Sequence, residues 1–112
     1  MEDKHTIRIL HYKDHLMSAT EKDGELYFVP DDIGEALGLD IDTLSKAKKL
    51  LEDDEKITIY FTKTNEEMGR YTVINEFGVY TLVFQSRNKK EAKEFLHWIS
   101  REFSWYENRK SR

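Results

Sequence analysis

The sequence predicts a small α+β domain in which two hairpin-like strand pairs and an N-terminal strand pack against about four helices, the last being the longest. Segments rich in β-branched and aromatic residues alternate with segments in which apolar residues recur at every third or fourth position. An Asp-Gly pair between two apolar runs indicates a tight hairpin turn. With 112 residues, 38% of them hydrophobic, the chain can bury one core and not two, so we expect residues 1–112 to form a single domain.

The first part of the chain contains three segments that we expect to be strands. Residues 6–12 (TIRILHY) are rich in β-branched and aromatic side chains. Residues 16–20 and 25–29 are apolar runs on either side of Asp23-Gly24, and glycine accepts the positive φ angle that a two-residue turn requires. The sequence therefore predicts an N-terminal strand followed by a β-hairpin.

Two short helices are expected next. The first begins near Asp32, whose carboxylate is a suitable cap, and it ends at Gly38. The second covers residues 43–51, because its leucines and alanine follow a spacing of three and four positions. Either Asp40 or Asp42 is expected to cap this second helix.

A second strand pair and a third helix follow. Residues 56–62 (KITIYFT) and 70–74 (RYTVI) have strand composition, and the polar stretch 63–69 between them is expected to be a mobile hairpin tip. Asn75 is expected to cap a helix that stops near Ser86. The apolar face of this helix consists of Val79, Tyr80, Leu82, Val83 and Phe84.

The last helix is expected to run from about Asn88, its cap, to near Tyr106. Trp98 and Trp105 lie on one flank of its apolar stripe, where they either pack at the edge of the domain or form a partner or dimer contact. The stripe that faces the core consists of Ala92, Phe95, Leu96, Ile99, Phe103 and Tyr106.

Charge is distributed unevenly along the chain. The net charge is −4, but residues 1–86 contain 10 basic and 18 acidic side chains, whereas residues 87–112 contain 8 basic and 4 acidic ones. A basic final quarter on an acidic body is compatible with a local anion-binding face, and equally with a solvated helix and a basic tail.

The residues with suitable chemistry for nucleic acid form two basic clusters. Their ammonium and guanidinium groups can neutralise phosphates, and an arginine can in addition donate two hydrogen bonds to a guanine edge. The first cluster lies in and just before the last helix and consists of Arg87, Lys89, Lys90, Lys93 and Arg101. The second lies in the second helix and consists of Lys46, Lys48 and Lys49.

Several classes of protein are excluded or disfavoured by what the sequence lacks. Without cysteine there are no disulfides, thiol nucleophiles or cysteine-based zinc sites. The longest uncharged runs fall far short of the roughly 20 apolar residues that cross a membrane. The charged start, residues 1–5, lacks an apolar signal region, so we expect a cytoplasmic protein.

We also expect no enzymatic activity, no metal and no cofactor. The chain has no serine–histidine–aspartate signature, no glycine-lysine phosphate loop and no dinucleotide-binding fingerprint. His5, His11 and His15 are the residues to consider for zinc. Strand residues six positions apart are about 20 Å apart, however, so a single strand cannot bring His5 and His11 to one ion.

Two motifs of the sequence are characteristic of a known family. The first is residues 26–38 (LYFVPDDIGEALG), a strand-to-helix segment. The second begins with residues 73–82 (VINEFGVYTL) and continues with Ser86, residues 91–95 (EAKEF), Trp98, Ile99 and Glu102. In order and spacing these motifs resemble the Bro-N domain of baculovirus Bro proteins and phage antirepressors. The resemblance extends over about residues 15–106 and implies a small α+β domain that binds DNA or works within a prophage regulatory circuit, in a bacterial or phage-infected cell.

Two functions follow from this resemblance and from the charge pattern. The first is a DNA-binding domain of antirepressor type that acts on transcription at an operator-like site. The alternative is a protein-interaction module that binds and inhibits a repressor or host protein without contacting DNA. The acidic body and the flanking Trp98 and Trp105 support this alternative. A homodimer is compatible with both functions.

Overall fold

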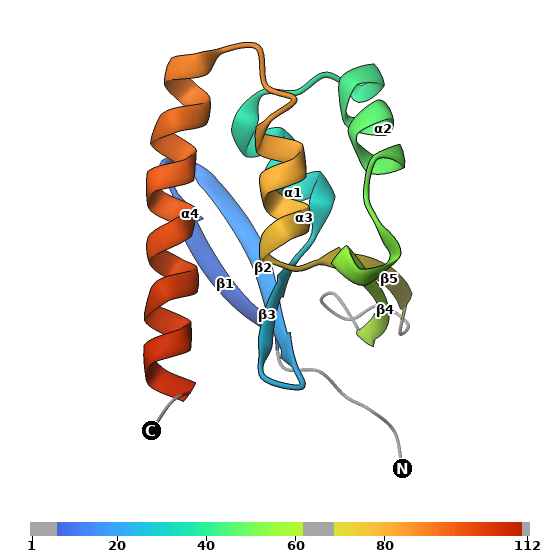
Figure 1. Cartoon of the computed structure of the whole chain (residues 1–112), viewed down its shortest axis with the longest axis vertical. Helices are drawn as coiled ribbons and strands as arrows, with labels where there is room; N and C mark the ends of the chain where they lie inside the picture. The colour runs from blue at the N-terminus through green and yellow to red at the C-terminus, as the bar shows by residue number, and fades with distance from the viewer. Residues whose placement is uncertain (1–6, 62–68, 111–112) are drawn as a thin grey trace.

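The computed structural model describes residues 7–61 and 69–110, and in this part of the chain five antiparallel strands form one sheet in the order β1-β2-β3-β5-β4 (Figure 1). The predicted α+β class is confirmed, and the predicted hairpin tip at residues 63–69 lies outside the described residues except for Gly69. The strands are β1 (Ile7–Tyr12), β2 (His15–Lys22), β3 (Glu25–Phe28), β4 (Lys56–Phe61) and β5 (Gly69–Ile74). The helices are α1 (Pro30–Leu37), α2 (Ile41–Lys49), α3 (Glu76–Val83) and α4 (Lys89–Lys110), with a 3-10 turn η1 (Asp53–Glu55) before β4.

The first three strands form a meander joined by two tight turns. Asp23 and Gly24 have φ angles of 53° and 81°, and the strands on either side pair from Lys22 to Glu25, which confirms the hairpin predicted from the Asp-Gly pair. The β1–β2 turn uses Lys13 at a φ of 54°, a conformation that non-glycine residues adopt less readily. Composition alone gave no sign of this second turn.

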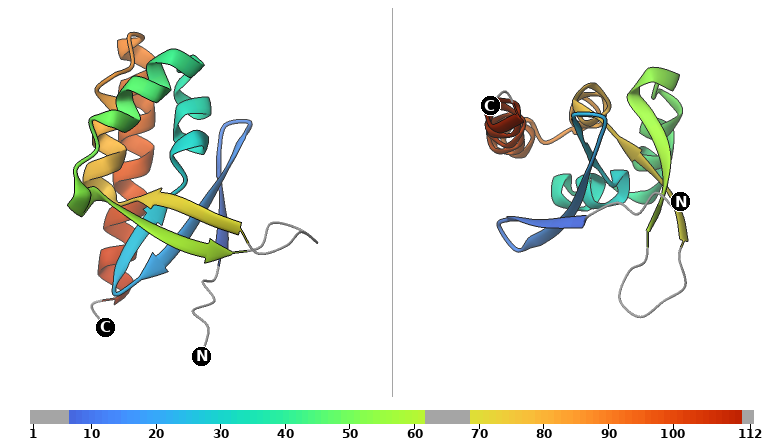
Figure 2. Two further views of the ribbon diagram at one scale, coloured as in Figure 1. Left: turned by 90° about the vertical axis from the view of Figure 1, so that its right-hand side faces the viewer. Right: turned by 90° about the horizontal axis from the view of Figure 1, so that it is seen from below.

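Within the described residues, a single residue pair joins this meander to the β4–β5 hairpin. That pair is Phe28 on β3 and Ile74 on β5, and beyond it the two parts of the sheet diverge (Figure 2). A second cluster of buried residues lies on the sheet face away from the main core, and it draws on both parts. Its buried members are Tyr27, Val29, Ile59 and Val73.

The main core lies between the sheet and helices α1, α3 and α4. The predicted stripe of α4 faces this core, with Phe95, Ile99, Phe103 and Tyr106 buried. Aromatic rings connect α4 to the strands: Phe103 meets Phe28 edge to face with the ring centroids 5.4 Å apart. Large buried rings of this kind contribute more to stability than any other side-chain type in so small a core.

Helix α1 does not begin as predicted. Val29 is its N-cap, and the hydrocarbon side chain of valine cannot accept a hydrogen bond. Pro30 at the first helical position has no N–H that needs a partner. The carboxylate of Asp32 instead accepts a 2.8 Å hydrogen bond from the backbone N–H of Ser18 and so ties α1 to β2. The interpretation of Asp32 as a cap was therefore wrong, whereas Asp40 does cap α2.

Asn75 joins three elements at the start of α3. Its side-chain oxygen accepts a hydrogen bond from Gly78 N–H, which confirms the predicted cap, and its amide nitrogen donates to the carbonyl of Asp54 in η1. Gly78 has no room for a side chain, since a Cβ there would lie 2.8 Å from Cβ of Ile74 and 3.0 Å from the carbonyl oxygen of Glu55. Helix α3 is thereby held close to both β5 and η1.

The double role of Asn75 predicts an unequal cost for replacing the two asparagine caps. Asn75→Ala removes both the buried cap bond to Gly78 and the partly buried hydrogen bond to the Asp54 carbonyl, so we expect a loss of about 2 kcal/mol in the free energy of unfolding, measured by urea denaturation. The matched control is Asn88→Ala, which removes only the exposed cap of α4 and should cost about 0.5 to 1 kcal/mol. Equal losses would contradict the joining role of Asn75.

Candidate nucleic-acid interface

The two predicted basic clusters approach each other at one end of the molecule. Helix α2 and the first turns of α4 both lie at the top of Figure 1, where the α1–α2 and α3–α4 connections also run. A hollow of about 150 Å³ separates these connections, and its walls include Asp40, Thr43 and Arg87. Arg87 of the first cluster therefore lies beside the start of α2, which carries the second.

The carboxylate of Asp40 is influenced by one cation from each of the two basic clusters. Hydrogen bonds from the backbone and side chain of Thr43 lower the pKa of the Asp40 carboxyl, and the positive charges of Arg87 and Lys46 lower it further. The backbone bond from Thr43 N–H is 2.7 Å long. Two cations, one from α2 and one from the α3–α4 connection, thus act on one exposed carboxylate.

The remaining cations of this end belong to the first turns of α4. Asn88 caps the helix by accepting a 3.1 Å hydrogen bond from Glu91 N–H, as predicted, and Lys89, Lys90 and Lys93 are exposed. We call the following five exposed residues the basic end: Lys46, Arg87, Lys89, Lys90 and Lys93. Glu94 is engaged elsewhere, in a 2.8 Å ion pair with Lys13 of the β1–β2 turn.

Lys48 and Lys49 lie in the last turn of α2, and Lys48 borders a groove outside the basic end. Its ammonium group pairs with Asp31 at 2.6 Å, on the wall of a groove of about 350 Å³ between α2 and the β4–β5 hairpin. Lys56 and Arg70 also line this groove. Among the described residues, neither of these two cations has an acidic partner within ion-pair distance.

Lys56 and Arg70 were not among the site residues predicted from the sequence, because strand alternation places them on one face only once the register of β4 on β5 is known. Lys56 lies opposite Ile74, and Arg70 lies opposite Tyr60, so both cations are on the same face of the hairpin. The relevant signal was the alternation in residues 56–60 combined with the register of β4 on β5. The register cannot be read from composition alone, since a shift of one residue would reverse the face.

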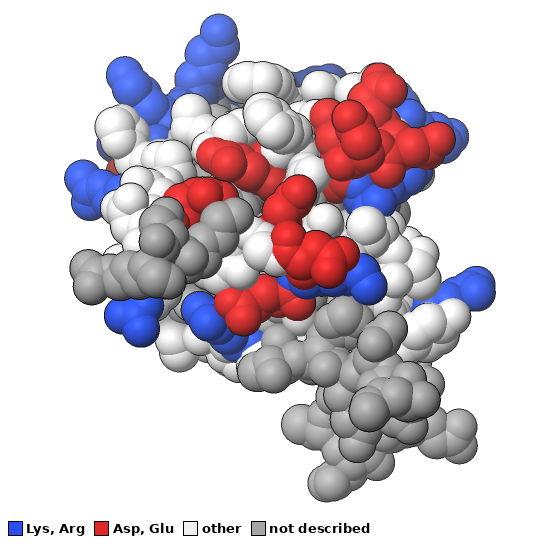
Figure 3. All heavy atoms as spheres, turned by 60° about the horizontal axis from the view of Figure 1, so that its bottom comes forward, with Lys and Arg blue, Asp and Glu red and all other residues white. Residues whose placement is uncertain are grey.

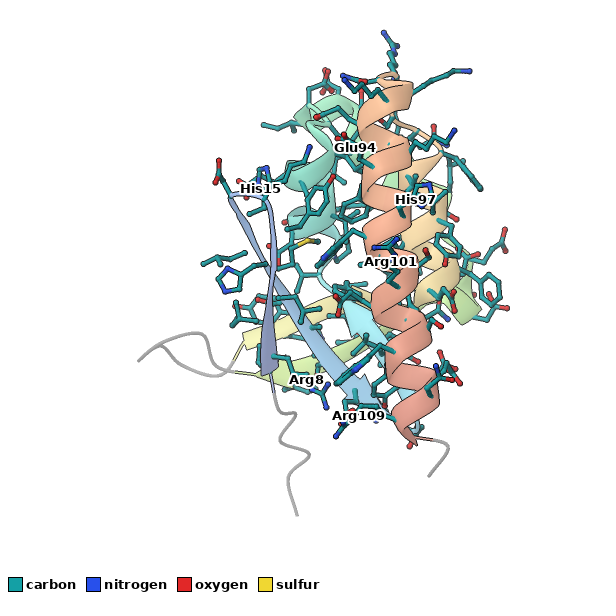
Figure 4. All side chains as sticks on the ribbon, turned by 90° about the vertical axis from the view of Figure 1, so that its left-hand side faces the viewer. Arg8, His15, Glu94, His97, Arg101 and Arg109 are labelled. Carbon is teal, nitrogen blue, oxygen red and sulfur yellow. The ribbon has the colours of Figure 1, made fainter. Side chains whose placement is uncertain are left out.

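Arg101 is not part of the basic end. It lies midway along α4, about 16 Å along the helix axis from Lys90, and points away from the sheet together with His97 (Figure 4). The predicted cluster of α4 is therefore split, with its last member isolated on the outer face. Lys49 is exposed at the end of α2, next to the engaged Lys48.

The two flanking tryptophans have different environments. Trp98 packs against the rings of Tyr12 and Phe95, with centroid distances of 5.1 and 5.8 Å, so it belongs to the edge of the core. Trp105 is 51% exposed, and the guanidinium carbon of Arg109 lies 4.8 Å from its ring centroid. Of the two, only Trp105 has the exposure that a partner contact requires, and that contact stays a prediction.

The opposite end of the molecule carries side chains of both signs. Figure 3 shows acidic and basic side chains together on the side that forms the bottom of Figure 1, where the β2–β3 turn and the last turns of α4 lie. Arg8 and Arg109 lie at this end (Figure 4). We call the three carboxylates that line one hollow there, Glu25, Glu76 and Glu107, the acidic end.

The described residues hold no group of three His, Cys, Asp or Glu side chains that could bind a metal ion. His5 lies outside them, while His11 and His15 are in β1 and β2. Nor does any helix in residues 7–61 and 69–110 have the length and apolar character needed to span a membrane.

Comparison with known proteins gives one match. The model of the BRO family, N-terminal domain, matches residues 15–104, from the start of β2 to within α4. Neither a curated protein nor a solved structure matches the chain.

The shared influence of Arg87 and Lys46 on Asp40 can be measured. Replacing both cations (Arg87→Ala with Lys46→Ala) should raise the pKa of Asp40, because two charges that favour the carboxylate are removed. The pKa should remain below its ordinary value, since the hydrogen bonds from Thr43 persist. The measurement is the side-chain carboxyl ¹³C shift against pH, with Lys90→Ala as the control that leaves it unchanged. An unaltered Asp40 titration in the double variant would show that the clusters do not meet there.

Proposed function

This chain belongs to the BRO family, N-terminal domain, and from that premise we propose that it is a regulatory protein of phage or prophage antirepressor type that binds DNA through its basic end. Membership in the family supports the regulatory role. The assignment of DNA as the ligand depends on the chemistry of the surface. We further propose that the domain acts by binding alone, without catalysis.

The observation that carries this proposal is the meeting of α2 and α4 cations at one end. Four side chains there come from the α3–α4 connection and the first turns of α4, and Lys46 joins them from α2. Cations that neutralise neighbouring phosphates release condensed counterions, which is the main source of affinity for a duplex. Arg87 can also donate two hydrogen bonds to guanine O6 and N7, which would give base selectivity.

The groove beside α2 extends this surface. Lys48 stands on the same helix as Lys46, and the groove that it borders also contains Lys56 and Arg70. A phosphate backbone that follows α2 would pass from the basic end to these groove cations. Contacts of this kind fix the position of a protein on DNA without reading sequence.

A second candidate function is supported by the acidic end. Glu25, Glu76 and Glu107 line one hollow there, and such a group of negative charges can engage the DNA-binding face of a repressor or host protein. The exposed Trp105 would serve as an apolar contact beside it. In this alternative the protein inhibits its partner without contacting DNA.

The DNA-binding proposal is tested by fluorescence anisotropy with duplexes from the region around the gene of this protein. The triple variant Lys46→Ala, Arg87→Ala, Lys90→Ala should bind about tenfold more weakly or worse at about 50 mM salt. The slope of log affinity against log salt should decrease by about 0.9 per lost phosphate contact, hence by about 2.7 for three.

The matched control is Arg109→Ala, which removes one cation at the other end of α4 (Figure 4) and should leave the salt slope unchanged. The wild-type protein failing to bind any of these duplexes at low salt would refute DNA binding. Retention of the repressor encoded at the same locus on the immobilised domain, with no DNA affinity, would then establish the second candidate.

A further inference from the structure

Helix α3 has an apolar outer face. Its inner residues Val79, Leu82 and Val83 are buried, yet Phe77 and Phe84 on the outside are 66% and 74% exposed. They are seven residues apart, hence on one side of the helix and about 10 Å apart along its axis. Surface helices normally place polar residues there. Phe84 was expected in the core-facing set, and its exposure corrects that expectation.

Each phenylalanine borders a hollow between α3 and α4. The hollow next to Phe77 measures about 260 Å³ and has Phe103 and Tyr106 of α4 among its lining residues. The hollow next to Phe84 measures about 270 Å³ and is lined in part by Ala92 and Leu96. The outer face of α3 and the adjoining face of α4 therefore form one strip with a hollow at each end.

The two ends of this strip carry opposite charges. Glu25, Glu76 and Glu107 surround the hollow at Phe77, whereas Lys89 and Lys93 border the hollow at Phe84. Since α3 and α4 are both part of the main core, the spacing of the two ends is fixed by the fold. The strip is thus apolar in its middle, acidic at one end and basic at the other.

We propose that this strip is the contact surface for a second copy of the chain, in a two-fold symmetric dimer with the α3 helices antiparallel. A two-fold axis through the middle of the strip, near Tyr80, places Phe77 of each copy against Phe84 of the other. The same operation brings Glu76 and Glu107 of each copy to Lys89 and Lys93 of its partner. Both charge contacts are then favourable, and neither copy has an unmatched end.

Charge complementarity is the reason to assign a second copy and not an unrelated protein. A surface that contains both an apolar patch and its own complementary charges is self-complementary, which is the requirement for a closed two-fold interface. The tryptophan flank expected to form such a contact lies elsewhere, since Trp98 packs on Tyr12 of β1. Lys89 and Lys93 also belong to the basic end, so in the dimer they contact the other copy, and Lys46, Arg87 and Lys90 remain to contact DNA. The dimer itself is tested without DNA.

A charge-exchange experiment distinguishes this arrangement from others. One variant carries Lys89→Glu and Lys93→Glu, and the other carries Glu76→Lys and Glu107→Lys. Each alone juxtaposes like charges at both ends of the interface, so its dimer should dissociate at least about tenfold more readily than the wild-type dimer in sedimentation equilibrium. An equimolar mixture restores opposite charges at both ends and should form heterodimers about as stable as the wild-type dimer.

A second pair of variants tests the apolar middle. Phe84→Ser should weaken the dimer at least about tenfold, and because the side chain is exposed, the unfolding midpoint should remain close to that of the wild type. The control Trp105→Ser changes an exposed aromatic residue outside the strip and should leave the dimer intact.

Three results would overturn the proposal: a monomeric wild-type protein at millimolar concentration, a mixture of the charge variants that stays monomeric while both are folded by circular dichroism, or loss of the dimer in Trp105→Ser. None of these readouts involves DNA. The DNA-binding variants Lys46→Ala, Arg87→Ala and Lys90→Ala leave the strip unchanged, so failure of one proposal does not imply failure of the other.

Discussion

The junction between β5 and α3, held by the buried Asn75, determines where every proposed contact surface lies. Ile74 supplies the pair with Phe28 that joins the two parts of the sheet, and Asn75 follows it directly. The backbone N–H of Asn75 donates to the carbonyl of Glu55, and its side chain, 7% exposed, links Asp54 and Gly78. Burying polar atoms without partners is costly, so the orientation of α3 is tightly constrained once this set is satisfied.

The position of α3 has consequences at both of its ends. Its C-terminal end sets the α3–α4 connection, and therefore brings Arg87 next to Asp40 and the start of α2. Its N-terminal end holds Glu76 and Phe77 beside the last turns of α4. The separation of acidic and basic ends is thus a result of packing, since no stretch of the sequence alone has this arrangement.

Local interactions explain which features the sequence predicted well. The Asp23-Gly24 turn and the caps at Asn88 and Asn75 each depend on residues at most three positions apart, so their residue types identify them. The resemblance to the Bro-N domain was confirmed because its motifs consist of such local signals. The fold class and the order of strands and helices could therefore be derived with little error.

Features that depend on distant partners could not be derived in the same way. Asp32 has the residue type of a cap, but its partner, the N–H of Ser18, lies in another strand. Lys56 and Arg70 share a groove only through the register of β4 on β5. Trp98 and Trp105 are equivalent on a helical wheel, and only the position of β1 distinguishes them.

Because its charge is unevenly distributed, a protein with a net negative charge can still bind a polyanionic ligand. Electrostatic attraction at a surface depends on the local arrangement of charge within about one Debye length, roughly 8 Å at physiological salt, and not on the total. The basic end lies at the start of α4, whereas Glu107 of the acidic end lies in its last turns, so screening weakens the repulsion from the acidic end more than the attraction at the contact. A molecule of this kind approaches DNA with its basic end. Total charge is therefore a poor criterion against DNA binding for this domain, whereas the arrangement of α2 against the α3–α4 connection is a relevant one.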